Sequence, residues 1–405
     1  MKKRSEKTGV IWNILGGMMN AGASVVLFLC VTRLCGAEQA GIFAVVFATA
    51  QMLMEVGCHG VRGYQASDIG EKYSFREYEV NRFISCAVMM LGVFLVIIVK
   101  KYESSVAYLM IFIGVFKMID ALADVYEGRL QQQHNLSACG KSLFLRTFFC
   151  ILIFALCTFM LNSMVWASFA MACMAVFLFG ILAYLPAKKT AGNAYGPDMR
   201  HVIGIFRESF PLFISLLLLA LVANIPKYAI EARLTYESQT IYNIIFLPAQ
   251  VTYLLVIYTF KPFITKMSYI YCDMRNRFRK YAAGLIGLTI LISGIILFLA
   301  NFMGIPVLQL LYGVPLKDYK TELLVIVAGG GINALVGLLY YFLTIMRKQK
   351  MSMIAYIMGT TGALLCSVFL VGRLGILGAA ICYDISNAII MFVMLMAVFF
   401  GMSDK

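Results

Sequence analysis

Residues 148–161 read FFCILIFALCTFML and residues 164–185 read MVWASFAMACMAVFLFGILAYL, and these two stretches decide the fold class. Neither contains a charged residue, and about 20 apolar residues are enough for a helix to cross the hydrocarbon core of a bilayer. Their apolar character is continuous rather than alternating. This pattern predicts membrane-spanning helices and excludes a membrane β-barrel.

The rest of the chain has the same character. Of its 405 residues, 61% are hydrophobic and only 13% are charged, whereas about 25% are charged in an ordinary soluble domain. So few charged residues cannot cover a water-facing surface of this size, which excludes soluble single-domain, disordered and disulfide-scaffold proteins. We expect an all-α, polytopic membrane bundle.

Twelve membrane spans are predicted, and they fall into two sets of six. The longest central polar segment, residues 186–207, divides an N-terminal six-helix lobe (1–185) from a C-terminal one (208–405). We expect the two lobes to enclose a central polar cavity, and any repeat that relates them must be parallel, with its axis along the membrane normal. The predicted spans are 10–32, 39–60, 83–99, 105–124, 142–162, 164–185, 208–230, 239–260, 281–303, 320–344, 351–371 and 375–401.

The basic residues predict the orientation of the spans. If the N-terminus, with Lys2, Lys3 and Arg4, is cytoplasmic, most of the 34 Lys and Arg residues fall in cytoplasmic segments. By the positive-inside rule both termini are then cytoplasmic, with Lys101 outside and Asn193 inside. The net charge of +14 is explained by this topology and by contact with anionic lipids, so we expect no nucleic-acid partner.

Motifs for catalysis, cofactors and metals are missing from the sequence. NLSACGKS (135–142) departs from a phosphate-binding loop because Asn135 replaces its first glycine and no strand precedes it. The 11 cysteines form no CxxC pair, and the three histidines are far apart in the sequence. We therefore expect no catalytic residues, no cofactor and no metal, and we interpret the chain as a transporter rather than an enzyme.

Charged residues within the predicted spans are the strongest functional candidates. Lys117 lies near the middle of span 105–124, where an ionisable group costs about 2.5–3.5 kcal/mol unless it faces protein or water. Asp120 and Asp124 follow at i+3 and i+7 and so share one helix face with it. Two interpretations stay open: a self-contained Lys117–Asp120 ion pair, or a stripe that lines a polar cavity.

Further polar candidates lie in the other spans. Asn224, Lys227 and Glu231 repeat the same spacing on the seventh span, and Asp384 lies within the last. Near span ends, snorkelling to the interface explains charged residues equally well, and interhelical hydrogen bonds explain polar ones. The end-of-span candidates are Arg33, Glu55, Arg62, Arg146, Lys227, Glu231 and Lys261, and the polar candidates are Asn13, Asn20 and Asn224.

Three segments carry a family resemblance. They are NILGGMMNAGASVVLFLCVTRLCGAEQAGIFAVVFATAQ (13–51), RGYQASDIGEKYSF (62–75) and GIPVLQLLYG (304–313). With the two six-helix halves, they resemble bacterial polysaccharide exporters of the Wzx type. Those exporters share a superfamily with multidrug and toxic compound extruders and lipid II flippases.

The resemblance implies a flippase in the bacterial cytoplasmic membrane. It would move a polyprenyl-diphosphate-linked oligosaccharide from the inner to the outer leaflet by alternating access, with Na⁺ or H⁺ as a possible coupling ion. Family members carry cavity cations on the first, second, seventh and eighth spans, and the residues on those spans here are Arg33, Arg62, Lys227 and Lys261.

Two alternatives to a flippase remain. A drug or cation antiporter of the same architecture would rely on acidic groups such as Glu55, Asp120 and Asp124. A membrane glycosyltransferase or polymerase is the other, and the short outer loops argue against it.

Overall fold

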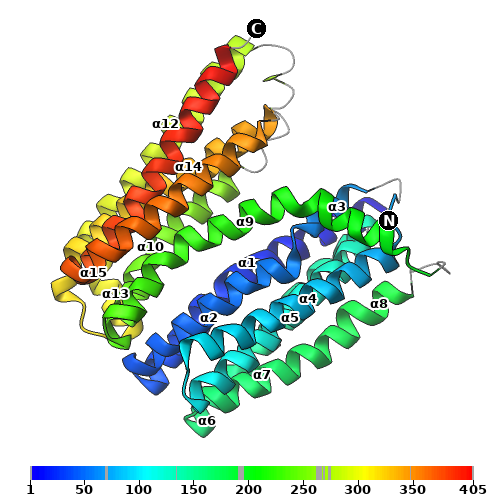
Figure 1. Ribbon diagram of the computed structural model, residues 1–405, viewed down its shortest axis with the longest axis horizontal. Helices are drawn as coiled ribbons and strands as arrows, with labels where there is room; N and C mark the ends of the chain where they lie inside the picture. Colours follow the sequence, from blue (N-terminus) through cyan, green and yellow to red (C-terminus); the bar gives the residue numbers. More distant parts are fainter. Residues whose placement is uncertain are drawn as a thin grey trace. The chain divides into compact units, whose positions relative to one another are not determined.

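The computed structural model describes residues 2–68, 72–133, 135–189, 196–260, 267, 270–271, 275–346 and 348–403. Within these residues every regular element is helical and none is a strand (Figure 1). The chain divides into two compact units, Met1–Leu217 and Leu218–Lys405, and the division falls inside one long helix, α9 (Met199–Arg233).

Unit 1 contains the first part of α9 and the helices before it. In its interior, α5 packs against α2, α4 and α7, so side chains on α5 face other helices rather than lipid. The elements are α1 (Lys2–Cys35), α2 (Ala37–Cys58), α3 (Val61–Ser67), α4 (Phe75–Lys100), α5 (Ser104–Gln132), α6 (Leu136–Leu161), α7 (Met164–Phe179), a π-helical turn η1 (Gly180–Tyr184) and α8 (Leu185–Lys188).

Unit 2 contains the remainder of α9 and the helices that follow it. Here α14 is the central element, because it packs against α10, α12 and α15. The elements are α10 (Tyr236–Phe260), α12 (Arg275–Leu299), the π-helical turn η3 (Ala300–Gly304), α13 (Ile305–Tyr312), the 3₁₀ turn η4 (Lys317–Tyr319), α14 (Lys320–Ile345) and α15 (Gln349–Ser403).

Eleven helical stretches in the described residues are long and apolar enough to cross a membrane. The last, Lys350–Phe400, covers both of the final two predicted spans. Its Gly375 has a non-helical backbone with φ 60° and ψ −131°, so α15 consists of two helices joined at a kink. Only glycine adopts such a conformation without strain. The number of membrane crossings, which the sequence puts at twelve, stays a prediction.

Local sequence signals set several helix boundaries. Ser74 begins α4 with a capping box: its hydroxyl accepts the Glu77 N–H at 3.3 Å, and the Glu77 carboxylate accepts the Ser74 N–H at 2.7 Å. Between α2 and α3, His59 and Gly60 both have positive φ. This break ends α2 and starts α3, which carries Arg62.

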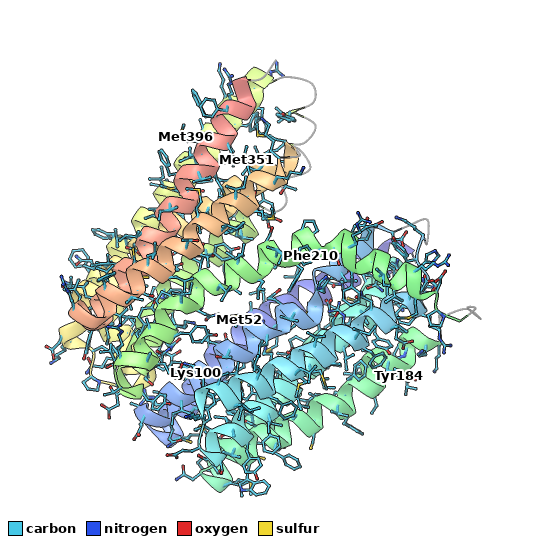
Figure 2. The ribbon with its side chains drawn as sticks, in the orientation of Figure 1. Met52, Lys100, Tyr184, Phe210, Met351 and Met396 are labelled. Atoms are coloured by element: carbon cyan, nitrogen blue, oxygen red, sulfur yellow. The ribbon has the colours of Figure 1, made fainter. Side chains whose placement is uncertain are left out.

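Apolar side chains cover much of the outer surface of the helices. Tyr184, Phe210, Met351 and Met396 are labelled examples in Figure 2, and all four are exposed. A water-soluble protein of this size does not expose apolar surface on this scale. Lipid is the natural contact of these side chains.

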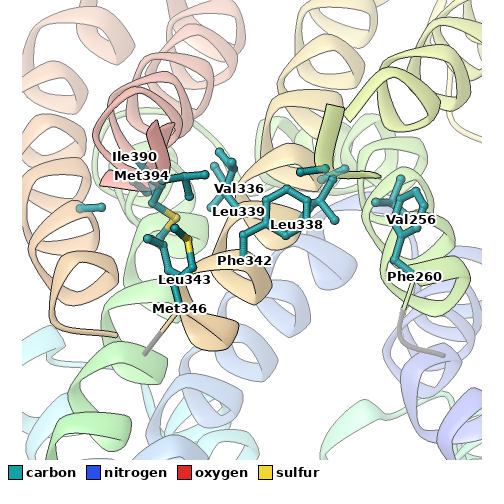
Figure 3. Packing of buried hydrophobic residues seen from close by; sticks show 14 of the residues in the cluster. Val256, Phe260, Val336, Leu338, Leu339, Phe342, Leu343, Met346, Ile390 and Met394 are labelled. Atoms are coloured by element: carbon teal, nitrogen blue, oxygen red, sulfur yellow. The ribbon is translucent and has the colours of Figure 1, made fainter. Parts of the chain in front are cut away.

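Both units have tightly packed apolar interiors. In unit 2, Val336, Leu339 and Phe342 of α14 pack with Val256 of α10 and Ile390 of α15 (Figure 3). In unit 1, α1 and α6 cross so closely that a Cβ on Gly140 would collide with the backbone of Asn13. Small residues at such crossings let helices approach each other in the membrane.

The Gly329–Gly331 run of α14 also serves packing. A Cβ on Gly329 would collide with the Asp384 carboxylate, and one on Gly330 would lie 2.6 Å from the Cα of Ala249. A Cβ on Gly331 would lie 2.9 Å from the Cβ of Ser293. The three glycines therefore bring α15, α10 and α12 close to one helix.

Candidate functional site: buried charges on the spanning helices

The polar stripe of α5 is buried inside unit 1. Lys117 and Asp120 are 5% and 7% exposed, and Glu127, ten residues after Lys117, continues the same face at 4%. The sequence predicts the first three members of the stripe, Lys117, Asp120 and Asp124. Glu127 is not among the predicted residues, although its spacing on the helix places it on this face.

Asp120 has two cationic partners. The Lys117 ammonium lies 3.4 Å from its Oδ2, and the Arg146 guanidinium of α6 donates to its Oδ1. Arg146 also reaches Glu127, with Nη2 3.5 Å from Oε1, and the Ser142 hydroxyl donates to Glu127 at 2.9 Å. The Lys117–Asp120 pair is therefore part of a larger cluster and is not self-contained.

Asp124 also has two cationic partners, both arginines. Arg62 of α3 lies 3.3 Å from Oδ1 and Arg82 of α4 lies 2.9 Å from Oδ2. Arg62 further donates to the backbone carbonyl of Asp124, and Arg82 donates to the carbonyl of Gly57 at 2.8 Å. The break at Gly60 turns α3 so that Arg62 meets α5 instead of following the second span toward the interface.

Lys117 is held more weakly than the arginines. Its distance to Asp120, 3.4 Å, exceeds the roughly 2.7–2.9 Å of a strong charge-assisted hydrogen bond. Its ammonium also lies 4.6 Å from the ring centroid of Phe47 and 5.0 Å from that of Phe116. Two aromatic rings and one shared carboxylate therefore stabilise this cation.

These residues form two adjacent groups of ion pairs, Arg62–Asp124–Arg82 and Lys117–Asp120–Arg146–Glu127, which we together call the unit 1 network. Arg62 and Glu127 interact electrostatically and so connect the two groups. The four cations of the network exceed its three carboxylates by one. Glu55 of α2 interacts electrostatically with Asp124, Arg82 and Lys117. In the part of the chain that the structure describes, its carboxylate forms no ion pair.

Unit 2 holds a second set of the predicted residues. Asn224 and Lys227 of α9 are both 8% exposed. The Lys227 ammonium lies 5.4 Å from the ring centroid of Phe246, which packs edge-on against Tyr383 of α15. Among the described residues, no carboxylate lies within ion-pair distance of Lys227. It is a buried cation without a counter-ion there.

Several buried polar atoms of unit 2 also lack hydrogen-bond partners among the described residues. They are Asp384 Oδ1, the Tyr242 hydroxyl, and both amide atoms of Gln239. Tyr242 stacks on Phe246 and interacts electrostatically with Asp384. Gln239, Tyr242 and Phe246 lie at i, i+3 and i+7 on α10, a stripe that the sequence analysis did not single out.

The other predicted residues have no ion pair with the residues above in the described structure. Arg33 is exposed in the last turn of α1, and Glu231 is half-buried near the end of α9. Lys261 lies outside the described residues, as does Asn193. Asn20 is exposed. The Asn13 side chain donates a hydrogen bond to the Leu136 carbonyl of α6 at 2.6 Å, so it connects two helices.

The polar end of unit 1 contains a carboxylate that the sequence analysis missed. Glu208 of α9 accepts hydrogen bonds from Tyr64 at 2.5 Å, Lys72 at 2.7 Å and Tyr73 at 3.0 Å. The hydrogen bond to Glu208 raises the pKa of the exposed Lys72. These contacts attach the start of α9 to the segment between α3 and α4.

No group of three His, Cys, Asp or Glu side chains among the described residues could hold a metal ion. The chemistry that the two clusters offer is charge and hydrogen bonding. This suits binding of a polar or anionic group within the membrane.

The sequence profile of a family described as "Polysaccharide biosynthesis protein" matches residues 7–268, which is more than half of the chain. The chain belongs to this family. The matched segment includes the whole unit 1 network and Lys227. The predicted resemblance to polysaccharide exporters is thereby confirmed.

Several solved structures share the fold at low sequence identity. The lipid II flippase MurJ, in an inward closed conformation, aligns with a TM-score of 0.71 at 12% identity, over 95% of this chain and 87% of that one. An inward-facing multidrug resistance MATE transporter of the MOP superfamily aligns with 0.67 at 13% identity, over 97% and 93%.

A MOP superfamily transporter from Pyrococcus furiosus aligns with a TM-score of 0.61 at 14% identity, over 99% of this chain and 97% of that one. These likenesses confirm the predicted all-α, multi-pass membrane fold. No curated protein matches the sequence.

Proposed function

We propose that this protein is a flippase that moves a polyprenyl-diphosphate-linked oligosaccharide across the bacterial cytoplasmic membrane for assembly of a surface polysaccharide. The observation that carries the proposal is the family match over residues 7–268. The fold shared with a lipid II flippase supports it.

The buried cations fit the chemistry of such a substrate. A diphosphate and its sugars cannot cross hydrocarbon unaided, so a path with fixed positive charge is required. Lys117 shares its carboxylate partner Asp120 with Arg146, and Lys227 has no carboxylate partner in the described part of unit 2. We assign a phosphate-binding role to each of these two lysines, with Asn224, Asp120, Asp124, Arg62 and Asp384 as supporting polar groups.

The proposal includes an arrangement in the membrane. Twelve crossings form two six-helix lobes around a central cavity that opens alternately to either side, and both termini are cytoplasmic. The lipid tail stays in the bilayer while the head group passes through the cavity. Na⁺ or H⁺ provides the coupling gradient.

Deletion of the gene tests the proposal in cells. We expect loss of the surface polysaccharide together with accumulation of its lipid-linked precursor on the cytoplasmic leaflet, both reversed by the native gene. Accumulation separates a transport defect from a synthesis defect. If the precursor does not accumulate, the protein acts in synthesis and the flippase proposal is wrong.

A drug or cation antiporter is the second candidate function. The observation that favours it is Asp384, a carboxylate with one buried oxygen that lacks a hydrogen-bond partner in the described structure. Such a group suits a cation or a proton. Growth of deletion and overexpression strains on cationic drugs tests it: an antiporter changes drug susceptibility, whereas the proposed flippase does not.

A further inference from the structure

The Arg146 side chain occupies a particular place in the unit 1 network. It is 2% exposed, and its guanidinium binds two carboxylates of the α5 stripe, Asp120 and Glu127. The two carboxylate oxygens of Asp120 have different partners: Oδ1 accepts a hydrogen bond from Arg146, and Oδ2 lies 3.4 Å from the Lys117 ammonium. Arg146 and Lys117 therefore share one carboxylate.

This sharing matters because of the charge balance of the network. Lys117 and Arg146 together balance Asp120 and Glu127, whereas Arg62 and Arg82 both bind Asp124. If Lys117 moves to another anion, Asp120 still has a cationic partner. Removing one partner from a buried ion pair is strongly destabilising only when the remaining charge is left uncompensated.

Resting on the proposed flippase function, we propose that Arg146 is a positioning residue that neutralises Asp120 and so allows Lys117 to leave it for the phosphate of an isoprenyl diphosphate. Without Arg146, Lys117 becomes the nearest counter-ion of Asp120 and binds the ligand poorly. With Arg146 in place, the ammonium exchanges one weak contact for a stronger one.

An arginine suits this position better than a lysine. Its planar guanidinium presents several N–H groups in fixed directions and stays charged when buried. It can therefore bridge Asp120 and Glu127 at once, as observed. A lysine offers one point charge on a flexible stem and cannot hold both carboxylates in place.

Binding of farnesyl diphosphate to the purified full chain in lipid nanodiscs tests the proposal. We expect Arg146→Met to weaken binding roughly tenfold, equivalent to about 1.4 kcal/mol, and Lys117→Ala to weaken it at least as much. The two effects should not add, because Arg146 acts through Lys117. Combining Arg146→Met with Asp120→Asn should restore native affinity, since Lys117 then has no aspartate to compensate.

Arg82→Met is the matched control for loss of a buried arginine, because Arg82 is equally buried but binds Asp124. Its effect should add to that of Lys117→Ala. Thermal unfolding of each variant measures its folded fraction. If Arg146→Met does not fold, Arg146→Lys replaces it, with a smaller loss that again disappears in the Lys117→Ala background.

The outcomes separate the two proposals. Additive losses for Arg146 and Lys117, or no recovery with Asp120→Asn, would overturn the positioning role of Arg146 and leave the flippase proposal intact. Native affinity in Lys117→Ala would overturn the role of Lys117 as well. No binding of farnesyl diphosphate to the native protein would contradict the assignment of an anionic head group itself.

Discussion

Lys227 and Lys117 are both buried lysines, yet their surroundings differ. Lys117 shares Asp120 with Arg146, while Lys227 has an aromatic ring beside it and no carboxylate within ion-pair distance in the described residues. A buried, uncompensated charge destabilises a folded protein. Its presence in unit 2 is therefore better explained by function than by stability.

Lys227→Met tests this interpretation. We expect a higher midpoint of thermal unfolding, because the substitution removes an uncompensated buried charge, and loss of polysaccharide export. Lys320→Met is the control: Lys320 is exposed at the start of α14, so its replacement should change stability by no more than about 0.5 kcal/mol. A lower midpoint for Lys227→Met would indicate a structural lysine.

Lys117→Ala should abolish surface polysaccharide while the protein remains in the membrane at normal abundance. Lys117→Arg should retain part of the activity, since the proposed role requires a cation at this depth. Export assays measure the surface polysaccharide, and quantitative immunoblotting of membranes measures the abundance of each variant. Normal export by Lys117→Ala, or loss explained by degradation, would leave Lys117 without a transport role.

Asp120→Ala should destabilise unit 1 by about 3–5 kcal/mol, because it leaves Arg146 and Lys117 without their shared carboxylate. Asp318, exposed in η4, provides a control, and Asp318→Ala should change stability by no more than about 0.5 kcal/mol. Denaturation in detergent measures the free energy of unfolding of both variants. Equal stability of both variants would mean that the network contributes little to folding.

For individual residues, the sequence predicts several members of the unit 1 network but not which side chains they pair with. Lys117, Asp120 and Asp124 lie within two helical turns, so their common face follows from helix geometry. Arg82 and Arg146 come from other helices, and their approach to α5 depends on tertiary packing. Arg146 was a candidate from its position in a span, whereas nothing local distinguished Arg82 from an interfacial arginine.

Among the elements, α14 shows how small residues organise unit 2. Gly330→Ala should cost about 1–3 kcal/mol, the range for overpacking, because the new Cβ would lie 2.6 Å from the backbone of Ala249. The same substitution at the exposed Gly284 of α12, which has nothing within 4 Å, should stabilise the helix by about 0.5–1 kcal/mol. We expect the midpoint of thermal unfolding to fall in Gly330→Ala and to rise in Gly284→Ala. A change in the same direction in both variants would contradict the packing interpretation.

The helices themselves were largely predictable, because long apolar runs have few alternatives in a membrane. Two features were not. The short helix α3 follows the break at His59 and Gly60, beyond the predicted end of the second span at residue 60, and the kink at Gly375 joins two predicted spans within one helical element. Both depend on the backbone conformation of single residues, which hydropathy does not report.

For the whole molecule, the twelve-crossing topology makes a direct prediction. A cysteine at Lys101, which follows α4, should react with a membrane-impermeant thiol reagent in intact cells. A cysteine at Asn193 should react only after the membrane is permeabilised. Both variants are made in a background without the native cysteines, and labelling of both from the same side would contradict the topology.

The central claim is that this protein moves a lipid-linked saccharide between leaflets. The most direct measurement uses vesicles that contain the purified protein and a fluorescent polyprenyl-diphosphate-linked oligosaccharide, with fluorescence quenched from outside by a reagent that does not cross the bilayer. We expect nearly all of the fluorescence to become quenchable with the native protein. With Lys117→Ala or Lys227→Met, only the half in the outer leaflet should be quenched. If native vesicles also stop at one half under an imposed Na⁺ or H⁺ gradient, the protein is not a flippase for this lipid.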